Sequence, residues 1–149
     1  MLIAIGCDHG GIVLKPAIID CLKKRGIEIQ DFGTFDEKSV DYPDFALKVA
    51  EAVASKKADA GVLLCGTGIG IGIAANKVPD IRCALVNNED MARLSKEHNN
   101  ANVISMGGRI TTPENAVKYV ETWLDAEYQG GRHQNRLDKI TAIEQKYSK

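Results

Sequence analysis

A cysteine followed by alternating glycines is the segment of this sequence best suited to chemistry. The segment comprises Cys65, Gly66, Thr67, Gly68, Ile69, Gly70, Ile71 and Gly72. Glycine lets the backbone approach a ligand closely, and successive N–H groups turned inward form an anion-binding concavity. Such amides would also stabilise a thiolate, so Cys65 is a candidate base. The alternative is that Cys65 is a small buried residue that ends a strand.

An acid and a histidine occupy a second glycine-rich turn. Asp8 and His9 precede Gly10 and Gly11, directly after the first apolar run of the chain. A turn of this kind that leads into a helix favours a bound anion, because backbone N–H groups and the helix dipole meet there. The competing interpretation is that Asp8 caps the helix and His9 is an exposed loop residue.

One histidine and three arginines complete the set of candidate polar residues. Histidine can donate and accept protons near neutral pH, so His98 is a candidate acid, although it could equally cap the end of a helix. Arg109 follows the last apolar run. Arg132 and Arg136 are four residues apart, so on one helix they would share a face and could bind one phosphate, or form a solvated basic face.

Several common classes of site are disfavoured by spacing. Cys7 and His9 form the only close Cys/His pair, and nothing nearby supplies two further ligands, so we expect no metal. The phosphate loop GxxxxGK is absent, and the dinucleotide pattern GxGxxG is met only loosely, from Gly70 to Ala75. A small anion, or an oxyanion formed during reaction, therefore suits the glycine segment better than a dinucleotide.

Composition and charge indicate an ordinary globular protein. The 149 residues are 44% apolar and 26% charged, with a net charge of −1. This balance gives no global attraction to nucleic acid or to an anionic membrane. We expect neither a signal peptide nor a membrane helix, and four widely spaced cysteines suit a reducing compartment, so the predicted location is cytoplasmic.

The elements that must position these residues follow a βαβ pattern in one domain over residues 1–149. The predicted strands are 2–7, 28–32, 60–64, 82–86 and 103–106. The predicted helices are about 13–24, 44–55, 70–76, 89–97, 113–125 and 135–147. Continuous apolar strands indicate a parallel sheet covered on both faces, in which ligands bind beyond the carboxyl ends of the strands. The last helix could pack on its own subunit or reach a partner.

Taken together, four motifs resemble the ribose-5-phosphate isomerase type B family, which also includes galactose-6-phosphate isomerase subunits. The similarity covers nearly the whole chain. The motifs are Asp8-His9-Gly10-Gly11 with Lys15, Ser39-Val40-Asp41-Tyr42-Pro43-Asp44, Cys65-Gly66-Thr67-Gly68-Ile69-Gly70 with Ala74-Ala75-Asn76-Lys77, and His98-Asn99-Asn100-Ala101-Asn102.

The resemblance implies a Rossmann-like three-layer α/β/α subunit with a five-stranded parallel sheet and a C-terminal helix. It also implies a homodimer with active sites shared across the interface, and leaves open whether dimers pair into tetramers. The implied reaction interconverts ribose 5-phosphate and ribulose 5-phosphate in the pentose phosphate pathway, through an ene-diolate and without metal or cofactor. The implied partner is a sugar phosphate, with no nucleic acid and no membrane.

The resemblance also assigns roles by position. Cys65 matches the base that moves the proton between C2 and C1, and Gly66 to Gly70 match the loop whose amides steady the ene-diolate. His98 matches the acid that opens the furanose ring, with Asp8 beside it on the sugar hydroxyls. Thr67 assists with hydroxyl protons, and Asn99 matches a sugar-contacting position. The implied phosphate ligands are His9, Arg109, Arg132 and Arg136.

Two other functions remain open from the sequence. An isomerase of a six-carbon aldose phosphate, such as allose 6-phosphate or galactose 6-phosphate, would use the same proton transfer in a longer pocket. A non-catalytic nucleotide-binding α/β module is the alternative from another class, but the expected phosphate loop is missing.

Overall fold

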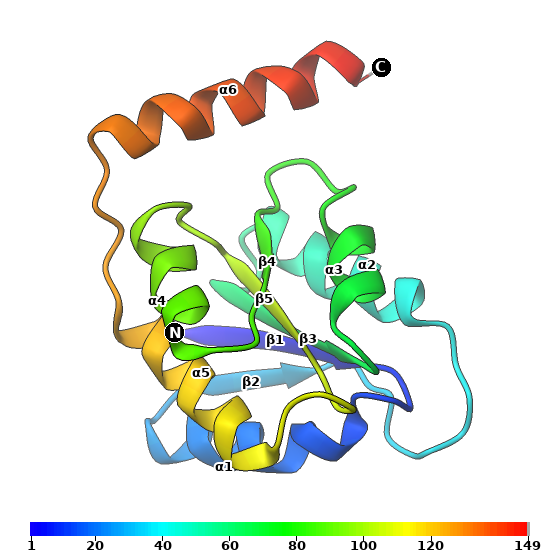
Figure 1. Cartoon of the computed structure of the whole chain (residues 1–149). Coiled ribbons are helices and arrows are strands. Elements are labelled where there is room, and N and C mark those ends of the chain that lie inside the picture. The colour runs from blue at the N-terminus through cyan, green and yellow to red at the C-terminus, as the bar shows by residue number, and fades with distance from the viewer. Residues whose placement is uncertain (149) are drawn as a thin grey trace.

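A parallel sheet of five strands forms the centre of the molecule in a computed structural model that describes residues 1–148 (Figure 1). The strand order is β2-β1-β3-β5-β4, so β1, β3 and β5 are the inner strands. The strands are β1 (Leu2–Cys7), β2 (Glu28–Asp31), β3 (Ala60–Cys65), β4 (Cys83–Leu85) and β5 (Val103–Gly107). The inner three are buried almost throughout, because helices cover both faces of the sheet.

Helices form a layer on each side of this sheet. The helices are η1 (Ile12–Leu14), α1 (Lys15–Lys24), α2 (Tyr42–Ala54), α3 (Ile69–Ala75), α4 (Glu89–Glu97), α5 (Pro113–Asp125) and α6 (Arg132–Tyr147). One apolar core joins α1, α4 and α5 to one face of the sheet, and the other joins α2 and α3 to the opposite face. The predicted three-layer α/β/α architecture is therefore confirmed.

Most predicted elements are confirmed, with small differences at their ends. The first strand and the helices 89–97 and 113–125 have the predicted bounds. Pro16 lies in the first turn of α1, where a missing N–H costs nothing. The first helical stretch begins instead with the short η1, and α2 begins two residues earlier than predicted because Tyr42 and Pro43 form its first turn.

Helix α6 belongs to neither helical layer. The chain leaves α5 in a segment without helix or strand, 126–131, and α6 then lies beyond the β4 edge of the sheet (Figure 1). Leu137 faces the body of the protein and is buried, whereas Ile140 and Ile143 are 46% and 60% exposed. Glu144 accepts a hydrogen bond from the backbone N–H of Asp80 at 3.1 Å. Most of the apolar side of α6 is thus left uncovered by its own chain.

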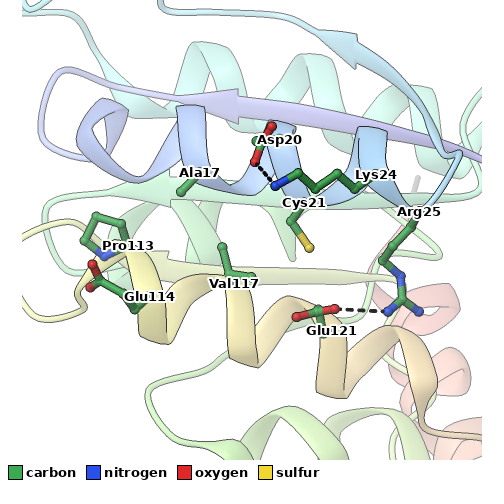
Figure 2. Close-up of a pocket in the computed structure, with 9 residues that line it drawn as sticks. All are labelled: Ala17, Asp20, Cys21, Lys24, Arg25, Pro113, Glu114, Val117 and Glu121. Carbon is green, nitrogen blue, oxygen red and sulfur yellow. Dashed lines mark hydrogen bonds and ion pairs between the residues drawn. The ribbon is translucent and has the colours of Figure 1, made fainter.

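Helices α1 and α5 pack side by side on the outer face of the larger core. Arg25, just after α1, pairs with Glu121 of α5 at 3.3 Å (Figure 2). It also pairs with Asp125 at the end of α5. A hollow of about 540 Å³ lies between the two helices, with Cys21 and Val117 among its lining residues. No residue of the glycine-rich loops lines it.

Candidate active site

The three inner strands end at one edge of the sheet and bring three loops together there. In the register of the sheet, Cys7 pairs with Leu64 and Cys65 pairs with Gly107. The residues that follow β1, β3 and β5 therefore surround one cavity of about 380 Å³. Its lining residues are Asp8, His9, Gly10, Tyr42, Cys65, Gly66, Thr67, Ile69, Gly70 and Arg109. Eight of the residues proposed from the sequence thus meet in one place.

Cys65 lies at the carboxyl end of β3 with its sulfur turned into the glycine loop. The Sγ atom accepts a hydrogen bond from the backbone N–H of Gly68 at 3.1 Å, and the side chain is 4% exposed. Gly68 has a φ of 82°, and a side chain there would meet the backbone of Met106 at 2.8 Å. Only glycine fits this position, and its amide points at the sulfur as a hydrogen-bond donor.

The other three cysteines are less suited to proton transfer. All four thiols are free. Burial raises the pKa of Cys7 to about 11 and that of Cys83 to about 12, so both remain protonated at neutral pH. Burial also raises the pKa of Cys21, which lies far from the glycine loop in the hollow between α1 and α5. Cys65 is the cysteine that lines the site cavity.

Asp8 both shapes its turn and lines the cavity. Its Oδ1 atom accepts hydrogen bonds from the N–H groups of Gly10 at 2.8 Å and Gly11 at 3.1 Å. The side chain is 6% exposed. Asp8 does not cap a helix, the alternative considered from the sequence, because neither η1 nor α1 has a side-chain cap. Its carboxylate instead holds the turn and is fixed beside the cavity.

His9 is oriented by the loop between β2 and α2. Its Nδ1 atom accepts a hydrogen bond from the backbone N–H of Val40 at 3.2 Å. A neutral imidazole that accepts at Nδ1 carries its proton on Nε2. The Nε2–H group is then free to donate to an anionic group of a ligand in the cavity.

Tyr42 is a lining residue to which the sequence analysis gave no role. It begins α2, and a side chain on Gly70 would lie 2.5 Å from its Cζ atom. The aromatic ring therefore rests directly on the glycine loop. The motif that contains Tyr42 was noted in the sequence, but nothing in its spacing placed the ring near Cys65.

A second group of the proposed residues lies elsewhere. His98 ends α4, and its ring stacks on that of His133 in α6 with centroids 4.3 Å apart and planes at 15°. Arg132 and Arg136 are exposed on the first turns of α6, on one helix as the phosphate hypothesis requires. Asn99, which follows α4, lines a hollow together with Leu137 of α6.

His133 is a further residue that the sequence analysis left without a role. It is 5% exposed. Loss of hydration lowers its pKa, and the neighbouring His98, Arg132 and Arg136 lower it further. A neutral His133 can stack on His98 without repulsion, which fixes the start of α6 against the end of α4.

The two groups lie at opposite ends of the strands: the group around Cys65 at their carboxyl ends and the group around His98 at their amino ends. The segment after His98 meets the start of β3, where the N–H of Gly61 donates to the carbonyl of Asn102 at 2.9 Å. Cys65 lies at the far end of the same strand, four residues or about 13 Å farther along. Within one chain, therefore, His98, Asn99, Arg132 and Arg136 do not share the cavity of Cys65.

Comparison with known proteins assigns the family. A family model described as Ribose/Galactose Isomerase matches residues 3–140. The chain belongs to this family. It is 49% identical over 144 residues to ribose-5-phosphate isomerase B of Escherichia coli, with 97% of each chain covered. It is also 43% identical over 146 residues to ribose-5-P isomerase B of Listeria innocua, covering 98% of this chain and 99% of the other.

Solved structures of the ribose/galactose isomerase family have the same fold. Ribose-5-phosphate isomerase B of Clostridium thermocellum has a TM-score of 0.98 and 59% identity, covering 99% of this chain and 100% of the other. The enzyme from Mycoplasma genitalium, with bound ribulose 5-phosphate, has a TM-score of 0.92 and 41% identity, covering 99% of this chain and 97% of the other.

The described residues contain neither a metal-binding cluster nor a helix that could span a membrane. Within residues 1–148, no three His, Cys, Asp or Glu side chains gather closely enough to hold a metal ion. No helix in the same range combines the length and apolar character needed to cross a membrane.

Proposed function

We propose that this protein is a ribose-5-phosphate isomerase B, which interconverts ribose 5-phosphate and ribulose 5-phosphate in the cytoplasm. The observation that carries the proposal is the Cys65 sulfur, which accepts a hydrogen bond from the Gly68 N–H at 3.1 Å in a small cavity that Asp8, His9 and Arg109 also line. Two comparisons support the proposal: the family model matches nearly the whole chain, and a relative was solved with bound ribulose 5-phosphate.

The proposed chemistry is a proton transfer between adjacent carbons. A Cys65 thiolate removes the C2 proton of the open-chain aldose, and the electron pair moves through C1 to the carbonyl oxygen. The resulting ene-diolate is held by the amides of the glycine loop, which are preorganised donors. The same thiol returns the proton to C1 and a hydroxyl proton moves between the oxygens, with Thr67 at hand, so no external reagent is consumed.

We place Asp8 on the sugar hydroxyls and His9 and Arg109 on the phosphate. Arg109 lies against the loop, since a side chain on Gly66 would be 3.4 Å from the Arg109 guanidinium carbon. A guanidinium can form two parallel hydrogen bonds to a phosphate, and the Nε2–H of His9 can add a third. This arrangement leaves the sugar carbons to extend toward Cys65.

The proposed active unit is a homodimer, with His98, Asn99, Arg132 and Arg136 completing the cavity of the other subunit. Three features support this proposal: the two groups lie at opposite edges of one chain, Arg132 and Arg136 are exposed, and α6 leaves apolar residues uncovered. In this arrangement His98 of one subunit opens the furanose ring held by Asp8 of the other.

The function is tested with the purified protein and a panel of aldose phosphates with five and six carbons, assayed for the ketose product in EDTA. We expect the highest kcat/KM on ribose 5-phosphate and no loss of activity in the chelator. A clear preference for allose 6-phosphate or galactose 6-phosphate would support the proposed proton transfer but show that the substrate is a six-carbon aldose phosphate. Absence of ketose formation from every substrate would refute the isomerase.

A further inference from the structure

Lys15 is a buried cation outside the cavity, with a set of partners that the proposed chemistry does not use. It begins α1 and is 6% exposed. Its Nζ atom lies 3.0 Å from Oδ2 and 3.2 Å from Oδ1 of Asp31, at the end of β2. It also donates to the backbone carbonyl of Thr34, and it lies 4.5 Å from the ring centroid of Phe35.

These partners account for the whole ammonium group. A buried lysine is costly unless its charge is paired and its donors are used. Asp31 supplies the counter-ion, Thr34 supplies a carbonyl, and the face of Phe35 covers the remaining side as a cation–π partner. Because Phe35 is itself 72% exposed, its position over Lys15 is not explained by burial of its ring.

Thr34 and Phe35 lie at the start of the loop that joins β2 to α2, residues 32–41, hereafter the 32–41 loop, and Asp31 directly precedes it. The same end is tied to β1 by backbone hydrogen bonds of 2.7 Å, from Cys7 to Gly33 and from Thr34 to Cys7. Asp31 also accepts from the N–H of Gly33 at 2.9 Å. Lys15 is therefore the side chain that joins α1, β2 and this loop.

The other end of the 32–41 loop reaches the active site. The N–H of Val40 donates to Nδ1 of His9 at 3.2 Å, and Tyr42 follows directly, resting on Gly70 in the cavity wall. Both contacts depend on the path of the loop, and residues 35–39 between its two ends are exposed. A loop whose middle is exposed is positioned by its attachment points.

We propose that Lys15, paired with Asp31, is a positioning residue for the isomerase reaction. By fixing the start of the 32–41 loop, it directs the Val40 N–H to Nδ1 of His9 and so keeps the proton of His9 on Nε2, facing the phosphate of the substrate. Lys15 touches neither substrate nor the reacting atoms. The kinetic part of this inference rests on the proposed function, whereas the effect on the His9 tautomer does not.

The test compares Lys15→Met with Arg25→Met in the full-length protein. Arg25→Met is a matched control, because it also removes a cation next to α1 that pairs with two acceptors on another element, α5. Arg25 lies on the side of α1 that lines the α1–α5 hollow (Figure 2). The tautomer of His9 is measured by long-range proton–nitrogen correlation spectra of the imidazoles, with His9→Gln used to assign the signal.

We expect His9 to be a single Nε2–H tautomer in the wild type and in Arg25→Met, and a mixture of tautomers in Lys15→Met. The KM for ribose 5-phosphate should rise roughly five- to tenfold in Lys15→Met, the value of about one hydrogen bond, with a smaller change in kcat. In a His9→Gln background the same substitution should leave KM unchanged, because Lys15 acts through His9.

A single Nε2–H tautomer in Lys15→Met would overturn the inference, whatever the kinetics. If the tautomers mix and KM is unchanged, Lys15 positions His9 as proposed and the assignment of His9 to the phosphate is wrong. Should Lys15→Met fail to fold, Asp31→Asn, which keeps the shape of the pair and removes its charge, is measured in the same way. A single Nε2–H tautomer in that variant would overturn the inference equally.

Discussion

At the scale of single residues, the division of labour depends on what surrounds each proton carrier. The sulfur of Cys65 accepts a hydrogen bond from the Gly68 N–H, beside the loop that would hold the ene-diolate charge. The ring of His98 stacks on that of His133. We therefore keep the proposal that Cys65 moves the proton between carbons and that His98 opens the ring beforehand.

Cys65→Ala should abolish isomerisation of any substrate, because loss of a positioned general base costs about 10²–10⁴-fold in rate. His98→Asn should slow turnover of ribose 5-phosphate strongly and of ribulose 5-phosphate much less, since ribulose 5-phosphate cannot close a furanose ring. The measurement is solvent deuterium exchange at the carbon beside the carbonyl of ribulose 5-phosphate. Near wild-type exchange in Cys65→Ala would mean that another residue is the base.

At the scale of elements, α6 contributes two exposed arginines in its first turns, and a phosphate is the ligand they suit. Replacing Arg132 or Arg136 by Ala should raise KM by roughly 10- to 100-fold, the value of a charge-assisted hydrogen bond, with a smaller effect on kcat. Lys146→Ala, which removes a cation from the other end of α6, is the control and should leave both constants unchanged. An unchanged KM in both variants would show that Arg132 and Arg136 do not bind the phosphate and are ordinary surface charges.

The contact between α4 and α6 should weaken in acid. Desolvation and the nearby His98, Arg132 and Arg136 place the folded-state pKa of His133 below its ordinary value of 6.5. The unfolded chain therefore binds the proton more readily, so the contribution of His133 to stability is complete above about pH 6.5 and declines as the pH falls toward the lowered pKa.

The test of this pH dependence is thermal unfolding between about pH 7.5 and pH 5, compared with His133→Phe, which keeps an aromatic ring and cannot be protonated. The midpoint of the wild type should fall more steeply in acid than that of the variant. Equal slopes for the two proteins would show that protonation of His133 does not affect stability.

The elements themselves were largely predictable, because apolar runs mark the strands and amphipathic spacing marks the helices. Apolar spacing predicts the start of α6 three residues too late, since Arg132, His133 and Gln134 show no apolar periodicity. The outer strand β4 is shorter than predicted. The position of Tyr42 against Gly70 depends on the path of an exposed loop, which local sequence does not determine.

The grouping of the site was only partly predictable. Asp8, Cys65 and Arg109 each follow an inner strand, and the carboxyl ends of parallel strands meet at one edge, so their proximity follows from the pattern. His98 precedes β5, and a helix that leads into a parallel strand ends near the amino ends of the strands, opposite to the site of Cys65. That order was visible in the sequence and already separates His98 from Cys65 within one chain.

At the scale of the whole molecule, exposed apolar side chains indicate which surfaces the proposed dimer would cover. Ile69 and Ile73 on α3 are 50% and 57% exposed, close to the glycine loop, and Ile140 and Ile143 are exposed on α6. Apolar patches of this kind commonly mark interfaces between proteins. A two-fold dimer that buries them would bring α6 of each subunit toward the cavity of the other.

The central claim is that each active site combines Cys65 of one subunit with Arg132 and Arg136 of the other. Its most direct test is a hybrid dimer, purified through two different tags, that joins a Cys65→Ala subunit to a subunit with both Arg132→Ala and Arg136→Ala. At substrate concentrations well below the wild-type KM, each parent homodimer should be nearly inactive.

The hybrid holds one site with all three residues intact and one site with all three replaced. We therefore expect about half of the wild-type activity per dimer, because the two-fold symmetry gives two equivalent sites of which one survives. A hybrid no more active than its parents would contradict the account, since every site would then be built from residues of a single chain.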